Sequence, residues 1–140
     1  ESFNYETKNS YQIRVRSTVE GGAYYEDEFT IGIIDVNDPP VLTPIEDKTA
    51  NEGELLTFTA EATDEDEVHT LTFNLRGAPD GASIDPDTGV FTWTPGEGDV
   101  GKSFTFSICV SDGAYRVCET ITITVGEQPL LKIYLPLISK

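Results

Sequence analysis

Residues 103–125 read SFTFSICVSDGAYRVCETITITV, and this stretch decides the fold. Apolar and polar residues alternate on both sides of a short polar segment, a pattern typical of two half-buried β-strands joined as a hairpin. If the hairpin turns at Gly113-Ala114, Phe106 faces Ile121 on the core side. The same register places Cys109 opposite Cys118.

The two cysteines of the chain are therefore expected to form a disulfide. Both would project from the outer face of the hairpin, where directly opposed β-carbons are close enough for the bond. The alternative is a pair of free surface thiols. A disulfide between Cys109 and Cys118 would imply an extracytoplasmic location, because the cytosol keeps thiols reduced.

Short alternating segments extend back from this hairpin to about residue 41. They predict strands at roughly 41–49, 54–62, 69–76, 81–84, 90–94, 103–111 and 116–125, separated by turn residues. This pattern is that of an all-β, Greek-key β-sandwich of about seven strands. The residues expected to face its core are Leu56, Phe58, Ala60, Ala62, Leu71, Phe73, Leu75, Phe104, Phe106, Ile108, Val110, Ile121, Ile123 and Val125.

The residues before this sandwich predict only a β-hairpin. Two clear strands, Tyr11 to Thr18 and Tyr25 to Val36, stand where a sandwich needs about seven. We therefore expect a partial repeat over 1–38, a complete sandwich over 39–126 and an apolar tail over 127–140. Two strands alone cannot bury the apolar side chains of the first part, namely Ile13, Val15, Phe29, Ile31, Ile33 and Ile34.

An acidic linker, Asp35-Val36-Asn37-Asp38-Pro39-Pro40, joins the two parts. If the strands run up and down in turn, the loops after the second and sixth strands lie at the pole where the first begins. Asp64, Asp66 and Asp112 would then converge on the linker. Carboxylates so close repel one another or become protonated, whereas calcium takes about six to eight such oxygen ligands. The alternative is a solvated acidic surface.

The linker resembles the signature of cadherin repeats. Asn4-Tyr5-Glu6 is similar to their acidic motif, with Asn4 at the usual Asp position, and Ala62 to Asp66 and Ser111-Asp112-Gly113 resemble the acidic loops of the following repeat. Residues 79–85, 88–95 and 99–101 look like the bacterial and dystroglycan-type branch of cadherin-like, Ig-like repeats. On this resemblance, residues 1–38 are the C-terminal remnant of one repeat and 39–126 are the next.

The resemblance implies calcium bound at the junction between tandem repeats, where it stiffens the linker. The implied ligands are Glu6, Asp35, Asp38, Asp64, Asp66 and Asp112, with backbone carbonyls such as those of Val36 and Asn37. The implied function is a structural or adhesive module at a cell surface or outside the cell. Its partners would be neighbouring repeats or identical subunits, or a cell-surface protein or polysaccharide. Residues 126–129 depart from the linker pattern, which makes a second calcium site at that end doubtful.

Composition argues against several other functions. The chain carries 25 acidic and 9 basic residues, a net charge of −16, which opposes binding to nucleic acid or to an anionic membrane face. No apolar run approaches the roughly 20 residues of a membrane span. The single histidine, His69, lies in an acidic loop, and the carboxylate pairs at 85 and 87 and at 97 and 99 sit in Gly/Pro turns. We therefore expect no enzyme.

A non-catalytic carbohydrate-binding module is the stronger alternative. It would need exposed aromatic side chains, and Tyr24, Tyr25 and Tyr115 fall in predicted loops. Phe91 and Trp93 instead alternate on the expected core face. A buried Trp93 would remove the best sugar-stacking residue.

The tail Leu130 to Ile138 is apolar but only nine residues long, too short to span a bilayer. It suits either an export or attachment element or a β-strand that pairs with an open sheet edge. Pro136 would confine such a strand to an edge. The tail of one chain could complete the first hairpin of another and build a fibre. The other possibility is that strands of a longer array cover that hairpin.

Overall fold

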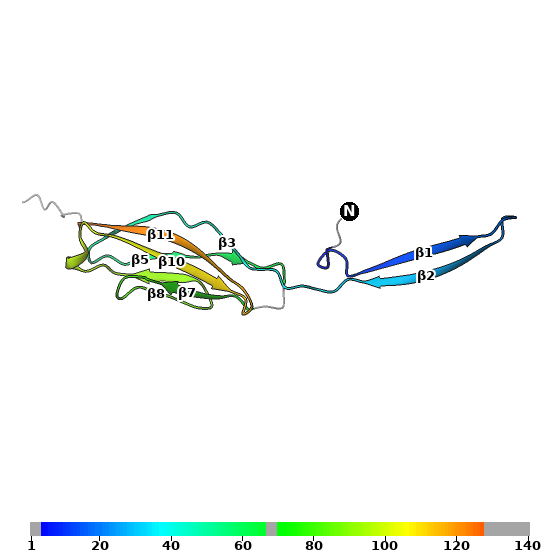
Figure 1. The fold of residues 1–140 in the computed structure, drawn as a ribbon. Helices are drawn as coiled ribbons and strands as arrows, with labels where there is room; N and C mark the ends of the chain where they lie inside the picture. Colours follow the sequence, from blue (N-terminus) through cyan, green and yellow to red (C-terminus); the bar gives the residue numbers. More distant parts are fainter. Residues whose placement is uncertain (1–3, 67–69, 128–140) are drawn as a thin grey trace, which may run out of the picture. The chain divides into compact units, whose positions relative to one another are not determined.

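The computed structural model describes residues 4–66 and 70–127, and Figure 1 shows its strands. The described chain divides into two units. The first consists of residues 4–38 together with Glu65 and Asp66, and the second of residues 39–64 and 70–127.

The first unit is built on an antiparallel hairpin of β1 (Ser10–Thr18) and β2 (Tyr24–Gly32). Nine residue pairs form its ladder, from Ser10 opposite Gly32 to Thr18 opposite Tyr24. Successive side chains of a strand point to opposite faces, so this register gives the hairpin one apolar and one charged face. Ion pairs of Arg14 with Glu28 (2.7 Å) and of Arg16 with Glu26 cross the charged face. The apolar face carries Tyr11, Ile13, Val15, Phe29 and Ile31, with Asp27 opposite Val15.

The second strand of this hairpin is shorter than the sequence predicts. We expected it to run to Val36, yet it ends at Gly32 because β1 begins at Ser10 and offers no partner beyond that pair. The amide of Ile33 donates one last bond of 2.9 Å to the carbonyl of Asn9. Tyr24, expected in a loop, instead begins the strand, and Tyr25 is its second residue.

The second unit is a two-layer β-sandwich. One sheet has the strand order β4-β11-β10-β7 and the other β5-β9-β8, with β3 and β6 forming a separate pair. The strands are β3 (Val41–Leu42), β4 (Lys48–Asn51), β5 (Leu56–Thr59), β6 (Ala62–Thr63), β7 (Thr72–Arg76), β8 (Ser83–Ile84), β9 (Val90–Trp93), β10 (Ser103–Ser111) and β11 (Arg116–Gly126), with the 3-10 turn η1 (Glu97–Asp99) before β10.

Aromatic side chains from both sheets fill the core of the sandwich. Phe91 is fully buried and stacks between Phe58 and Phe106, with ring centroids 4.8 and 5.6 Å away. Trp93 meets the ring of Phe104 edge-on at 5.1 Å. Burying one such side chain contributes about 1.5–3 kcal/mol, so this cluster accounts for much of what holds the sheets together. The predicted alternation of core residues is confirmed.

The first predicted strand, 41–49, is in fact two strands in different sheets. β3 pairs with β6, whereas β4 pairs in parallel with β11. Between them the chain crosses the edge of the sandwich, and side chains satisfy the backbone there. Ile45 donates its amide to Glu119 Oε2 at 2.8 Å, and Thr122 donates its amide to Asp47 Oδ1 at 2.7 Å. The second predicted strand, 54–62, is likewise interrupted and forms β5 and β6.

The last hairpin has the predicted register, with Phe106 opposite Ile121 and Cys109 opposite Cys118. A disulfide joins the two cysteines. Cys109 alternates with the core residues Ile108 and Val110, as expected for the outer face, yet it is fully buried, while Cys118 is exposed. The reason is its place in a central strand, since Asn74 on β7 flanks it on one side and Cys118 on the other.

Candidate metal centre

A turn at the start of the first unit presents Glu6. The side chain of Asn4 accepts a 3.0 Å hydrogen bond from the amide of Thr7, and its backbone carbonyl accepts one of 3.0 Å from Lys8. Asparagine favours such turns because its side-chain oxygen bonds to amides a few residues on. The turn leaves the Glu6 carboxylate exposed.

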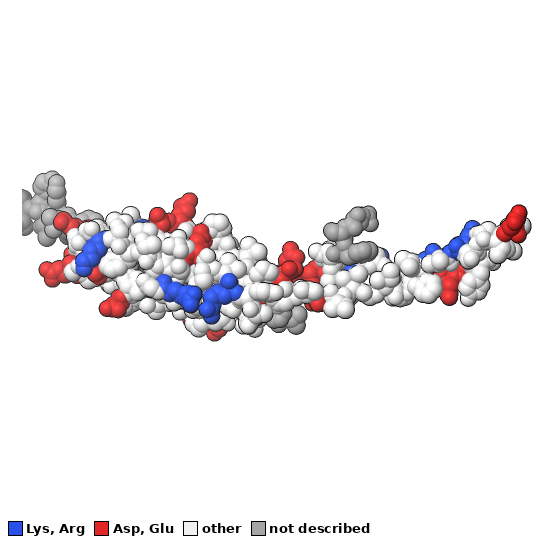
Figure 2. All heavy atoms as spheres, in the orientation of Figure 1, with Lys and Arg blue, Asp and Glu red and all other residues white. Residues whose placement is uncertain are grey.

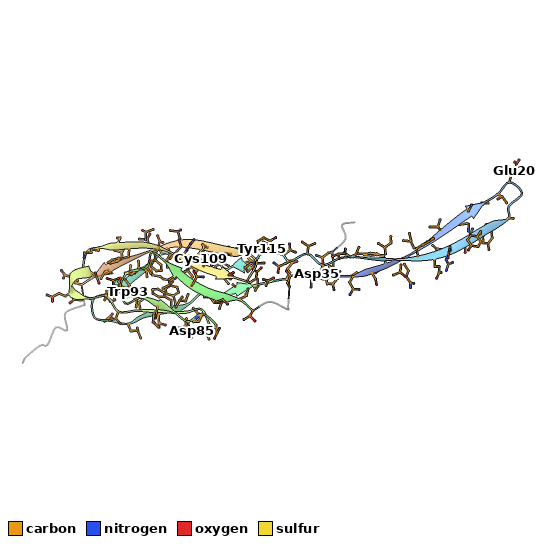
Figure 3. All side chains as sticks on the ribbon, turned by 60° about the horizontal axis from the view of Figure 1, so that its bottom comes forward. Glu20, Asp35, Asp85, Trp93, Cys109 and Tyr115 are labelled. Carbon is orange, nitrogen blue, oxygen red and sulfur yellow. A yellow bond between two sulfur atoms is a disulfide. The ribbon has the colours of Figure 1, made fainter. Side chains whose placement is uncertain are left out.

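Asp35 approaches the same place from the end of β2. In Figure 3 it lies beyond the end of the hairpin opposite to the one that carries Glu20. Asp35 and Glu6 line a common open hollow of about 230 Å³. The other residues around the hollow are Asn4, Tyr5, Ile33, Ile34, Val36 and Asp38.

Asp66 completes the cluster. It falls between β6 and β7 in the sequence but belongs to the first unit, where only 3% of it is exposed. Its Oδ2 accepts a 2.7 Å hydrogen bond from the amide of Asp38. Carboxylate oxygens of Glu6, Asp35 and Asp66 all lie within 4.8 Å of one another.

The chemistry of this cluster fits a hard divalent cation. Three carboxylates at this separation repel one another strongly unless a cation or protons neutralise them. Every donor in the set is oxygen, which suits calcium and not the softer metals that prefer nitrogen or sulfur. The surroundings add to the negative charge, since acidic side chains far outnumber basic ones in the chain and are visible on both units (Figure 2).

Further candidate oxygen ligands come from linker residues 36–38, which belong to the first unit. The amide nitrogen of the Asn37 side chain donates a 3.0 Å bond to the backbone carbonyl of Asp38. Asn37 Oδ1 is shielded from solvent. Val36 and Asp38 line the hollow with Glu6. Of the predicted ligands, Glu6, Asp35 and Asp66 therefore lie together, with Val36, Asn37 and Asp38 in the adjacent linker.

The remaining predicted ligands, Asp64 and Asp112, belong to the second unit. Asp64 has one carboxylate oxygen shielded from solvent. Asp112 is nearly buried and shapes the turn after β10, where its Oδ1 accepts bonds from the amides of Ala114 (2.7 Å) and Tyr115 (2.6 Å). Neither belongs to the three-carboxylate group found among the described residues.

One feature of the site has no signal in the sequence. The bond from the Asp38 amide to Asp66 joins residues far apart in the chain and involves a backbone group, so residue identity does not reveal it. The acidic residues themselves were found, because their type and their place in loops are visible in the sequence.

The residues on which the other functional hypotheses depend have structural roles. Trp93 is 2% exposed and donates its indole N–H to the carbonyl of Asp80 at 3.2 Å, so it offers no sugar-stacking face. Asp85 accepts bonds from the amides of Asp87 and Thr88, and Asp99 Oδ2 accepts one from Gly96. His69 lies outside the described residues.

No helix in the described part of the chain is long and apolar enough to cross a membrane.

Fold and sheet order together define a cadherin-like, Ig-like β-sandwich module. The sequence of residues 39–126 matches the He_PIG family, described as "Putative Ig domain", and the chain belongs to that family. No curated protein sequence matches the chain.

Solved structures of similar fold include tandem cadherin repeats. The extracellular cadherin domains 1–4 of protocadherin gamma B7 align with 91% of this chain at 19% identity and a TM-score of 0.68, and 34% of that chain is covered. Repeats EC1-2 of human protocadherin-24 align with 91% at 14% identity and a TM-score of 0.67, covering 70% of that chain.

An enzyme also contains a similar fold. An endo-fucoidan hydrolase of glycoside hydrolase family 107 aligns with 84% of this chain at 21% identity and a TM-score of 0.53. This chain spans only 19% of the hydrolase and 34% of the gamma B7 structure. At these identities the likeness concerns the fold.

Proposed function

We propose that this chain is a calcium-stiffened structural module of an extracellular or cell-surface protein, with the ion clamping the junction of two tandem repeats. The observation that carries the proposal is the cluster of Glu6, Asp35 and Asp66 oxygens within 4.8 Å. Val36, Asn37 and Asp38 of the linker, with Asp64 and Asp112, complete the ligand set in this proposal.

The origin of Asp66 explains how an ion would stiffen the chain. Glu6 precedes β1 and Asp35 follows β2, whereas Asp66 comes from the connection between β6 and β7. An ion held by all three carboxylates ties that connection to the linker at one point. Pro39 and Pro40 restrict the linker further, because proline fixes φ.

The proposed organisation is a repeat remnant over 1–38, a complete repeat over 39–126 and a tail over 127–140. Two observations support the remnant. The β1–β2 hairpin has nine residue pairs and an apolar face. The β10–β11 hairpin of the sandwich also has nine residue pairs, and the opposite sheet covers its apolar face. The structural likeness to tandem repeats, at 91% of the chain, also extends beyond residues 39–126.

The expected partners are neighbouring repeats of the same protein or identical subunits, and, in an adhesive role, a cell-surface protein or polysaccharide. The disulfide between Cys109 and Cys118 supports an extracytoplasmic location, because such bonds persist in oxidising compartments.

A calcium titration followed by thermal unfolding tests the proposal. At a free calcium concentration a hundredfold above Kd, binding to the folded state alone adds about 2.7 kcal/mol of stability. The melting temperature should therefore rise with calcium, and magnesium should give a smaller rise because it demands rigid octahedral geometry. Small-angle X-ray scattering of the same samples should show a narrower distribution of interatomic distances with calcium. Equal melting temperatures in excess calcium and excess chelator would refute the proposal.

A further inference from the structure

The strand β5 has an open edge. It pairs with β9 on one side, and no other described strand pairs with Leu56–Thr59 on the opposite side. The amide of Ala60 bonds to Gly89 on the β9 side. Because backbone groups alternate sides along a strand, Thr57 and Thr59 direct their N–H and C=O groups to the open edge. These are the groups with which an added strand would pair.

The edge of β5 is open because the chain turns toward the other sheet after β3. β3 pairs with the neighbouring β6, and the amide of Thr43 just after β3 bonds to the carbonyl of Glu61 at 2.8 Å. At Pro44 the chain departs for the other sheet, and a hollow of about 350 Å³ begins there. Apolar Pro44, Ile45 and Phe58 line it together with charged Glu46, Lys48 and Glu61. The hollow is thus a slot beside a strand edge, with three apolar side chains and charges of both signs on its walls.

The C-terminal tail has the sequence pattern of a strand that could fill this edge. All acidic residues of the chain precede residue 128, whereas the segment beyond carries Lys132 and Lys140 and is otherwise mostly apolar. Leu131 and Ile133 alternate with Lys132, so a strand would present apolar side chains to one face and an ammonium to the other. We propose that residues 130–134 add to the open edge of β5 in the same molecule, with Leu131 and Ile133 toward Ile45 and Phe58 and Lys132 on the opposite face.

The tail leaves the sandwich close enough to reach this edge. β11 ends at Gly126, whose carbonyl accepts a 3.1 Å bond from Glu52 in the turn before β5. Residues 127–129 can span about 10 Å. The added strand would enter beside Leu55, an apolar residue that is 64% exposed, and run parallel to β5. Pro136 lacks an amide hydrogen and would end the pairing.

The same edge is a better docking place for the tail than the first hairpin. One strand added beside β1 or β2 would extend that two-stranded sheet but leave its apolar face uncovered. At β5 the added strand would cover the slot wall formed by Ile45 and Phe58 and satisfy the backbone groups of Thr57 and Thr59 together.

Amide hydrogen exchange measured by NMR tests the proposal on two proteins, the full chain and a version ending at residue 128. Exchange at Thr57 and Thr59 should be at least tenfold slower in the full chain. The amide of Leu75 is the internal control and should exchange equally in both. It lies on the open edge of β7, since Phe73 two residues earlier donates its amide to Pro86 and not to β10.

Substitution in the tail identifies the residue that carries the contact. Ile133→Glu should abolish the protection, because it places a charge against Ile45 and Phe58. The control change Lys140→Glu should leave the protection unchanged. Equal exchange of Thr57 and Thr59 in the full and shortened chains would overturn the proposal. So would protection that appears only at concentrations where the protein dimerises, because the tail of a second copy would then be the occupant. Both measurements are made in chelator, so they do not depend on calcium binding.

Discussion

Gly89 packs against the backbone of Ala60, whose amide donates a 2.9 Å hydrogen bond to the Gly89 carbonyl. The glycine is buried at the end of the turn between β8 and β9, with φ at +70°. A side chain there would overlap the carbonyl oxygen of Ala60 and lie 3.2 Å from the ring of Phe73. The turn is also tied to β7, because the carbonyl of Pro86 accepts a 2.8 Å hydrogen bond from the amide of Phe73. One turn thus connects β9 to strands of both sheets.

Gly89→Ala should therefore destabilise the sandwich severely. Gly77→Ala is the matched control, because Gly77 also has φ at +70° but open space around it. The control substitution should lower the free energy of unfolding by about 1–2 kcal/mol, because alanine is strained in the left-handed backbone conformation. Gly89→Ala should cost at least about 2 kcal/mol more, since overpacking adds to that strain. Urea unfolding of the two variants measures the difference, and equal losses would show that the turn can move away from Ala60.

Replacing Asp66 with Asn should weaken calcium binding by about tenfold or more, equivalent to about 1.4 kcal/mol. The substitution keeps an oxygen that can accept the bond from the Asp38 amide but removes the negative charge. Glu65→Gln is the control, because Glu65 is exposed and lies outside the carboxylate cluster. Isothermal titration calorimetry with calcium measures both. Equal affinities in the two variants would remove Asp66 from the ligand set.

Replacing both cysteines with alanine should lower the free energy of unfolding by about 2–3 kcal/mol. The bond joins residues only nine apart, so in the chain-entropy account it restrains a short loop of the unfolded chain. Chemical denaturation of the double variant against the oxidised protein gives the value. Mass spectrometry of the non-reduced protein after thiol labelling should find no added label. Two labels would mean that the cysteines are reduced in solution.

The turn at Asp85 should make stability depend on acidity. Hydrogen bonds from the Thr88 amide, the Thr88 hydroxyl and the Asp87 amide lower the pKa of the Asp85 carboxyl. A depressed pKa in the folded state means that ionised Asp85 stabilises the protein above its unfolded pKa of about 3.9. That contribution is lost as the pH falls through the folded pKa.

Asp85→Asn should therefore lower the melting temperature at neutral pH and converge with the unmodified protein in strong acid. Thr88→Val removes only the hydroxyl donor, so it should raise the pKa of Asp85 in an NMR titration of its carboxyl carbon. A melting-temperature difference that is constant over the whole acid range would contradict this account.

The sequence predicted the long elements well and the short ones poorly. Strands β10 and β11 could be placed within a residue because their alternation continues over nine or more positions and one turn fixes their register. The split of the first strand into β3 and β4 was missed, because alternation along 41–49 does not show which sheet each half joins. For the site, side-chain type revealed the acidic residues. The gathering of Glu6, Asp35 and Asp66 depends on turns and on a backbone bond that only the folded chain displays.

The parallel pairing of β4 with β11 determines how the sandwich would respond to mechanical load. β4 lies near the beginning of the second unit and β11 at its end, and four residue pairs join them from Lys48 with Ile123 to Asn51 with Gly126. Tension applied through the two ends of a parallel pair pulls the strands past each other in shear, so their hydrogen bonds must break together. An antiparallel pair loaded at one end would instead unzip bond by bond. The sandwich is therefore built to resist extension along the chain, and after rupture the disulfide would keep residues 109–118 from adding their length to the stretched polymer.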